Sequence, residues 1–476
     1  MMEPFSERLS ALDAIFLDLE SETVPMHVGA ALIFDAKPLT LANGGLDIDR
    51  IRNYTLTALE SIPRYRQRLA WVPGLNHPVW VDDDRFNINF HLRHTRLPRP
   101  GDERMLKRVV GRVFSQELDR SRPLWEFWVV EGVEKDQFAM VCKAHHCMVD
   151  GVAGVELLQE LLRFGPLQPE REPRPWTARP APSRMKLLRD ELEHRADGLR
   201  ELTHFMPRLR KDLGGAIGVL RSGMKLGPDT IFTAEDISPY RRFDWTSFDL
   251  ADVKTIKNAL GGTINDVVLV VTTTAIRRFL EARHVDVDRI EDFRAFLPVN
   301  LRKPGGGSIG NQVAMLLAEL PVSEPDPIER LRKIIRVTTA LKKESNQPAG
   351  AQLLEDIANL TTRKLILGIS RAAIRRRAYS IVITNVPGPP LELHLLGATM
   401  TSIYPLVPIP PTQKLGVALF SYAGRLCWGF NADWERFPDV HEFVELLESS
   451  FEDYLSRAQG APEARSQARG DATAAP

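Results

Sequence analysis

Apolar residues along this chain alternate between two spacings, one typical of strands and the other of helices. Continuous apolar runs bounded by turn-forming or charged residues, as at residues 28–34 and 138–144, predict buried strands. Apolar residues that recur every three or four positions, as at residues 48–62 and 263–280, predict helices that bury one face. Because strands and helices follow one another in this way, the pattern favours an α/β fold.

The same two spacings continue toward the C-terminal region. Further strands are predicted at residues 126–131, 243–248, 293–299, 313–320, 379–384, 415–422 and 426–431. Further helices are predicted after Gly151, at residues 249–260 and at residues 438–455. Gly261 and Gly262 separate two of the predicted helices, and Thr263 is placed to begin the second.

Two segments interrupt the alternation. Residues 165–183 are rich in Pro and Arg and have no periodicity, which predicts a linker. After it, residues 184–226 place apolar residues at helical intervals among many charges. The resulting division is an N-terminal lobe at residues 1–164, a linker with amphipathic helices at 165–240, a C-terminal lobe at 241–457 and a disordered tail at 458–476.

Composition narrows the class of protein. The chain has 476 residues, 43% of them hydrophobic, and its 62 basic and 62 acidic residues cancel, so a nucleic-acid partner is not expected. Three cysteines without CxxC spacing indicate a reducing compartment. The first residues lack the order of a secretory signal, and no apolar run reaches the roughly 20 residues of a spanning helix. A cytoplasmic protein, soluble or peripheral, is therefore expected.

Two basic segments each allow two interpretations. Between Arg184 and Leu226 there are ten basic and six acidic residues, which suits either solvated helices over the core or a surface that rests on anionic lipid. A second basic cluster could form a solvated helix face or bind phosphates of coenzyme A or lipid head groups. It consists of Arg371, Arg375, Arg376 and Arg377.

Candidate chemistry lies at the end of the predicted strand 138–144, where His145 and His146 are followed by Asp150 and Gly151. An alcohol is a weak nucleophile at neutral pH, and a neutral imidazole has a suitable pKa to accept its proton during attack. Consecutive side chains on an extended segment point in opposite directions, so only one histidine easily faces a given cavity. Asp150 could cap the next helix or bind an arginine, and Gly151 permits a tight backbone.

Spacing alone leaves three other interpretations of this run open. The histidines could belong to the core, with Asp150 as a helix cap. They could bind a metal, although the sequence supplies no third or fourth ligand at close spacing. Cys147 could be a nucleophile, although nothing in the sequence marks its thiol as activated.

The pattern His145-His146-x-x-x-Asp150-Gly151 resembles the signature of the coenzyme A-dependent acyltransferase superfamily, which includes chloramphenicol acetyltransferase and peptide-synthetase condensation domains. Other stretches resemble the bacterial wax ester synthase/diacylglycerol acyltransferase family. They are residues 9–17, residues 25–29, Pro123-Leu124-Trp125-Glu126, Asn265-Asp266 and Asn385-Val386-Pro387-Gly388-Pro389. The stretches follow one another in the order expected for the family, and together they are specific.

The resemblance implies a two-lobed, chloramphenicol-acetyltransferase-like architecture of mixed sheets and helices, with an active-site tunnel between the lobes. It implies that His146 is the general base and that His145, Asp150 and Gly151 support it. Acyl-CoA would be a substrate, with no bound cofactor and no metal. The acceptor would be diacylglycerol or a long-chain alcohol, giving triacylglycerol or wax ester at the inner face of the membrane or on lipid inclusions.

The remaining motif residues could be structural or bind substrate. Trp125, with Pro123 and Leu124, suits the core as well as a ligand contact. Asp266 lies three residues after Thr263 and so fits a capping box, whereas Asn265 has no such explanation. Two rival functions are an acyltransferase for another acceptor, and a lipid-surface binding protein without catalysis.

Overall fold

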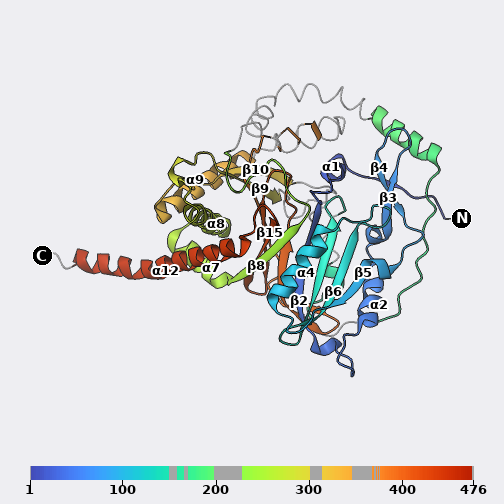
Figure 1. Ribbon diagram of the computed structural model, residues 1–476, viewed down its shortest axis with the longest axis horizontal. Coiled ribbons are helices and arrows are strands. Elements are labelled where there is room, and N and C mark those ends of the chain that lie inside the picture. The colour runs from blue at the N-terminus through green and yellow to red at the C-terminus, as the bar shows by residue number, and fades with distance from the viewer. Residues whose placement is uncertain are drawn as a thin grey trace.

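The computed structural model describes residues 2–148, 158–165, 170–197, 228–300, 313–345, 367–368, 371–372, 374 and 376–473. Two six-stranded sheets lie side by side, each with helices packed against it (Figure 1). Each sheet contains parallel and antiparallel neighbours, so the prediction of an α/β fold with mixed sheets is confirmed.

The first sheet has the strand order β12-β13-β2-β7-β6-β5. Its strands are β12 (His394–Leu395), β13 (Ala398–Leu406), β2 (His27–Asp35), β7 (Gln137–His145), β6 (Trp125–Val133) and β5 (Leu92–Arg96). Along β2, Leu32 and Phe34 pack into one core, and Ala31 and Ile33 pack into another. Because successive strand residues point to opposite faces, this continuous apolar run buries both faces of the sheet.

Helices cover the two faces of the first sheet. The core on one face includes residues of α1 (Ala11–Leu19) and α2 (Ile48–Ala58). The opposite core includes α4 (Glu103–Ser115), whose Leu106, Val110 and Phe114 pack against the strands. A smaller sheet joins β1 (Glu7–Arg8), β4 (Pro78–Asp82) and β3 (Gln67–Trp71), and a short helix α3 (Ile88–His91) precedes β5.

The second sheet has the strand order β10-β9-β11-β14-β15-β8. Its strands are β10 (Val313–Glu319), β9 (Arg294–Asn300), β11 (Ile381–Val386), β14 (Leu415–Tyr422), β15 (Arg425–Asp433) and β8 (Arg241–Asp249). Its core is completed by α7 (Leu250–Leu260), α8 (Ile264–Glu281), α9 (Pro327–Ser345) and α12 (Val440–Thr473). Short 3-10 turns lie at Lys37–Leu39, Pro63–Arg66 and Val287–Arg289.

Two sets of contacts connect the two lobes. The strand β13 follows β11 in the chain, yet it pairs antiparallel with β2 and so completes the first sheet. On the other side, α4 packs against β8, and Phe243 and Trp245 of β8 join the core beneath α4. Gly111 allows this approach, because a Cβ there would lie only 2.7 Å from the carbonyl oxygen of Arg241.

The structure differs from the sequence-based expectation at the C-terminal end. The helix α12 begins at Val440, close to the predicted start, but continues to Thr473 and projects beyond the lobe (Figure 1). A disordered tail was expected over residues 458–476. Ala, Arg, Gln and Glu are strong helix formers, so this segment can extend a helix that the core has already nucleated.

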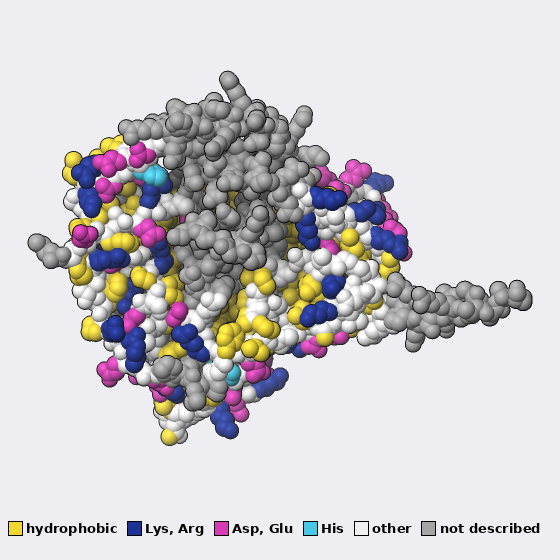
Figure 2. All heavy atoms as spheres, turned by 180° about the vertical axis from the view of Figure 1, so that it is seen from behind, with side chains coloured by type: hydrophobic (Ala, Val, Ile, Leu, Met, Phe, Trp, Pro, Cys, Tyr) yellow, Lys and Arg dark blue, Asp and Glu magenta, His cyan; other side chains and the backbone are white. Residues whose placement is uncertain are grey.

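Between the lobes in sequence, residues 170–183 have no regular secondary structure and residues 184–197 are helical. Residues 198–227 of the predicted amphipathic segment lie outside the described residues. Within the described part of the chain, no single helix has the length and apolar composition to cross a membrane, and α7 with α8 passes that test only as a pair bent by 93°. Side chains of both charge signs are interspersed over the face shown in Figure 2.

Candidate active site

The two histidines stand where β7 ends and a turn begins. His145 is the last residue of β7, and residues 146–148 form the turn. The backbone N–H of His146 donates to the carbonyl of Met26 at 2.8 Å, and that of Met148 donates to the carbonyl of His145 at 2.9 Å. The turn is therefore held against the segment that enters β2.

The ring of His146 is half-buried and lies on an aromatic ring. Phe16 of α1 stacks on it with ring centroids 3.7 Å apart and planes inclined by 14°. The Nδ1 atom of His146 is buried and has no hydrogen-bond partner among the described residues. Burial lowers the pKa of His146 to about 4, although its own backbone opposes the shift. The imidazole is therefore neutral at physiological pH and keeps a lone pair with which to accept a proton.

The ring of His145 is fully buried and has different neighbours. Its Nδ1 accepts the backbone N–H of Cys147 at 3.1 Å, so the proton of this ring resides on Nε2. Nε2 lies 3.3 Å from Oε1 of Glu20, close enough for a favourable charge contact but not aligned for a hydrogen bond. The rings of the two consecutive histidines therefore have different neighbours, as expected because consecutive side chains on an extended strand point in opposite directions.

Glu20, the residue that ends α1, lies at the centre of this region and was not singled out from the sequence. Its Oε2 accepts two hydrogen bonds from Arg120, at 2.6 and 3.1 Å, and its Oε1 accepts the backbone N–H of Met26 at 3.2 Å. Nε2 of His27 lies 3.4 Å from the same Oε1. Burial alone would raise the pKa of Glu20, but His145 and Arg120 outweigh it and lower that pKa to about 2. The carboxylate is therefore charged although it is buried.

His27 and Lys143 complete the buried polar surroundings. Burial and the nearby charge of Lys143 lower the pKa of His27 well below its usual range, so this ring is neutral. Burial also lowers the pKa of Lys143 to about 8, despite the carboxylate of Glu126 at 3.6 Å. The Lys143 ammonium donates to the last carbonyls of α4, at Val113 and Gln116, each at 2.9 Å. This bond ties α4 to the strand that carries the histidines.

The Pro123-Leu124-Trp125 element is placed directly beside the histidines. The carbonyl of Leu124 accepts the backbone N–H of His145 at 2.9 Å. Trp125 is fully buried, its Nε1 donates to the carbonyl of Tyr65 at 2.8 Å, and its ring stacks on His91. These contacts give Trp125 a place in the core and support the end of β7 through the backbone.

Asn265 and Asp266 begin α8 in the second lobe. Asp266 forms the predicted capping box with Thr263, and it also accepts a hydrogen bond from Thr338 at 2.6 Å. Asn265 accepts a hydrogen bond at 2.7 Å from Asn385, which belongs to the Asn-Val-Pro-Gly-Pro stretch. Two of the motif stretches therefore meet here through their asparagines.

Several predicted features fall outside what the structure describes. Asp150 and Gly151 lie outside the described residues, so the positioning role of Asp150 stays a prediction.

Two of the alternative chemistries receive no support in the described part of the chain. Burial raises the pKa of Cys147 well above its usual range, which disfavours a thiolate nucleophile. Within that part, no group of three His, Cys, Asp or Glu side chains is arranged to hold a metal ion.

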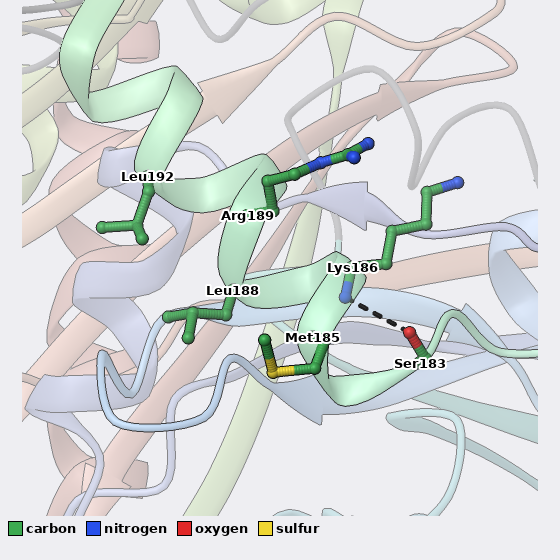
Figure 3. Close-up of a pocket in the computed structure, with 6 residues that line it drawn as sticks. All are labelled: Ser183, Met185, Lys186, Leu188, Arg189 and Leu192. Carbon is green, nitrogen blue, oxygen red and sulfur yellow. Dashed lines mark hydrogen bonds between the residues drawn. The ribbon is translucent and has the colours of Figure 1, made fainter.

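Two hollows among the described residues have linings that include neither histidine. One of about 560 Å³ is lined by the helical residues 184–192 and Ser183, with Lys186 N–H donating to Ser183 Oγ at 3.2 Å (Figure 3). The side chains of Met185, Leu188 and Leu192 line it together with those of Lys186 and Arg189. The tunnel between the lobes stays a prediction.

Comparisons with known proteins cover almost the whole chain. Residues 9–268 match the wax ester synthase/diacylglycerol acyltransferase catalytic domain, and residues 309–454 match the WS/DGAT C-terminal domain. A putative diacylglycerol O-acyltransferase of Mycobacterium tuberculosis is 31% identical, over 96% of this chain and 92% of the relative. The O-acyltransferase WSD of Acinetobacter baylyi is 30% identical, over 93% and 96% respectively.

Solved structures show the same two-lobed architecture. A wax ester synthase/diacylglycerol acyltransferase from Marinobacter aquaeolei VT8 is similar with a TM-score of 0.67 and 26% identity, over 95% of this chain and 100% of that chain. The first condensation domain of the calcium-dependent antibiotic synthetase is similar in fold, with a TM-score of 0.57 and 14% identity, over 95% and 96%. The expected chloramphenicol-acetyltransferase-like fold is therefore confirmed.

Proposed function

Because this chain belongs to the wax ester synthase/diacylglycerol acyltransferase family, we propose that it transfers a long-chain acyl group from acyl-CoA to a lipid alcohol. The acceptor is diacylglycerol, giving triacylglycerol, or a long-chain alcohol, giving wax ester. Acyl-CoA is a substrate in this proposal, and neither a metal nor a bound cofactor takes part.

His146 is the general base in this proposal. The hydroxyl oxygen of the acceptor attacks the thioester carbonyl carbon while its proton passes to the neutral imidazole. The tetrahedral intermediate then collapses, the carbon–sulfur bond breaks, and the imidazolium returns the proton to the sulfur of coenzyme A. One ester and one free thiol are formed, and no acyl-enzyme intermediate is required.

The observation that carries the proposal is the state of His146 itself. Its ring is held by Phe16 and by the backbone bond to Met26, and its lowered pKa keeps the ring neutral, with one unprotonated nitrogen, before the acceptor binds. A neutral imidazole in a fixed orientation is what a hydroxyl needs for proton removal.

Diacylglycerols and long alcohols are nearly insoluble in water, so the enzyme must reach them at a lipid surface. We propose peripheral contact through the helical residues 184–197, at the inner membrane face or on lipid inclusions. This helix presents Met185, 75% exposed, and Leu192, 51% exposed, beside Lys186 and Arg189 (Figure 3). Apolar side chains that enter the interface, with basic side chains at head-group level, are typical of peripheral binding.

The decisive experiment supplies purified protein with palmitoyl-CoA and a panel of acceptors: diacylglycerol, hexadecanol, an amine and water. Release of coenzyme A is followed as free thiol, and the products are separated by class. Triacylglycerol or wax ester formation supports the proposal. Acylation of the amine alone would assign another acceptor, and the absence of thiol release with every acceptor would favour a non-catalytic lipid-binding protein.

A further inference from the structure

The helix α1 contacts both histidines of the site. Phe16 stacks on the ring of His146, and Glu20, four residues later, lies against the ring of His145. Residues four apart lie on the same side of a helix, one turn from each other. The helix is defined at both ends, because Ser10 Oγ accepts the N–H of Asp13 and the N–H of Glu20 donates to the carbonyl of Phe16.

Glu20 links the three chain segments that meet behind the histidines. It ends α1, it accepts the backbone N–H of Met26 at the entry to β2, and it faces His145 at the end of β7. Arg120 balances its charge and also donates to the carbonyl of Leu17 at 3.1 Å. A buried carboxylate that is hydrogen-bonded in this way fixes the relative positions of the groups around it.

The carboxylate also determines which nitrogen of His145 carries the proton. A negative charge at 3.3 Å favours the tautomer with its proton on Nε2. In that tautomer Nδ1 can accept the N–H of Cys147, which closes the turn next to His146. In the other tautomer two N–H groups would face each other at 3.1 Å, and the turn would lose this bond.

We propose that Glu20 is a positioning residue for acyl transfer, which holds His145 in the Nε2–H tautomer and thereby orients the turn that presents His146. The proposal rests on the proposed role of His146 as general base. It also gives a role to α1, which contains most of the motif at residues 9–17, because this helix places Phe16 and Glu20 against the two histidines.

Three substitutions separate the contributions of Glu20. Glu20→Gln keeps the shape and removes the charge, Glu20→Met removes charge and acceptor, and Glu20→Asp keeps the charge on a shorter side chain. Glu22→Gln is the matched control, since that glutamate is exposed two residues further along the chain. Thermal unfolding identifies any variant that does not fold, and Glu20→Gln, as the nearly isosteric change, preserves the test if Glu20→Met fails to fold.

The first readout does not depend on activity. Long-range ¹H–¹⁵N correlation spectra of histidine-labelled protein report the tautomer of each ring, and His145→Gln assigns the signal. We expect a pure Nε2–H pattern for His145 in the parent and in Glu22→Gln, and a mixture of tautomers in Glu20→Met. An Nδ1–H pattern in the parent, or an unchanged pattern in Glu20→Met, would overturn the proposal.

The second readout is the kinetics of the same proteins. We expect kcat to fall roughly 10- to 100-fold in Glu20→Met, as is common when a supporting residue of a catalytic group is lost. KM for acyl-CoA should change little, and Glu20→Asp should recover part of the rate.

If His146→Ala retains full activity while the tautomer of His145 still depends on Glu20, the general-base role of His146 fails and the link between Glu20 and His145 stands. If His146→Ala is inactive and Glu20→Met is as active as the parent, the positioning role fails alone.

Discussion

Phe16 lies flat on His146, with ring centroids 3.7 Å apart. This stacking shields one face of the imidazole from water, and shielding from water is the main cause of the lowered pKa of His146. The hydrophobic side chain thus influences the protonation of its neighbour as well as its orientation.

Replacing His146 by alanine should leave a folded protein whose acyl transfer is reduced roughly 100- to 10,000-fold, the usual contribution of a general base. His145→Ala should cost less activity but more stability, because it leaves the Cys147 N–H and the Glu20 carboxylate without their neighbour. Thiol release and urea unfolding of both variants check this. Small and equal losses of activity would contradict the assignment of His146.

Replacing Phe16 by alanine should raise the pKa of His146 from about 4 toward its ordinary value near 6.5, because water then reaches the ring. A base works only when it is unprotonated, so kcat/KM of the parent should hold as pH falls from 7 to 5. The Phe16→Ala variant should lose activity over that range. Phe90→Ala, at an exposed phenylalanine elsewhere, is the control and should behave like the parent.

Stability should fall as the solution is acidified below about pH 6.5. The folded-state pKa values of His27 and His146 are both lowered, so the unfolded chain binds protons that the folded chain does not. The free energy of unfolding that the two neutral histidines contribute is fully present above the ordinary histidine pKa and is lost progressively as pH falls. Below about pH 4.5 the protein also loses the stability that the charged Glu20 contributes, and this loss continues as pH falls toward the lowered pKa of Glu20, about 2. Urea unfolding at pH 7, 6 and 5 measures the first range, and His27→Gln should flatten it; an unchanged pH dependence would contradict the role of His27.

Replacing Lys143 by methionine should lower the free energy of unfolding by about 3 kcal/mol. The substitution leaves the buried carbonyl of Val113 and the partly buried carbonyl of Gln116 without their donor, and it leaves Glu126 with Arg93 as its remaining cation. Lys254→Met, at an exposed position of α7, should have little effect. Equal stabilities of the two variants in chemical unfolding would show that the buried ammonium contributes nothing.

Binding to anionic vesicles should weaken as salt rises and persist partly through apolar contact. Met185→Gln combined with Leu192→Gln should reduce the part that is resistant to salt, whereas Leu41→Gln, an exposed leucine elsewhere, should not. Charge reversal at Arg208, Arg210 and Lys211 should reduce the salt-sensitive part. Vesicle sedimentation measures both, and parent-like binding by all these variants would place the lipid contact elsewhere.

The sequence predicted those strands and helices whose apolar spacing is strong. Val28 to Phe34 was expected as a strand and is the centre of β2, and the capping box of Thr263 and Asp266 does begin α8. Local patterns suffice for such elements because burial on a fixed face determines them.

Long-range relations could not be predicted in this way. The pairing of β13 with β2 joins residues about 370 positions apart, and nothing local in residues 398–406 indicates which sheet the strand enters. The helix α4 was not predicted although its apolar residues have helical spacing, so that omission was avoidable. Glu20 was missed because an acidic residue is usually exposed, and only the fold shows that this one is buried against two histidines.

The exchange of β13 into the first sheet bears on protein engineering. The match to the first family domain ends at residue 268, and the match to the second begins at residue 309. The strand β13, which pairs with β2 of the first domain, nevertheless belongs to the second domain. A fragment cut at that junction would expose the edge of β2 and would tend to aggregate. Chimeras between relatives should therefore take β2 and β13 from the same parent, and a single crossover at the domain junction, which gives these two strands different parents, should be avoided.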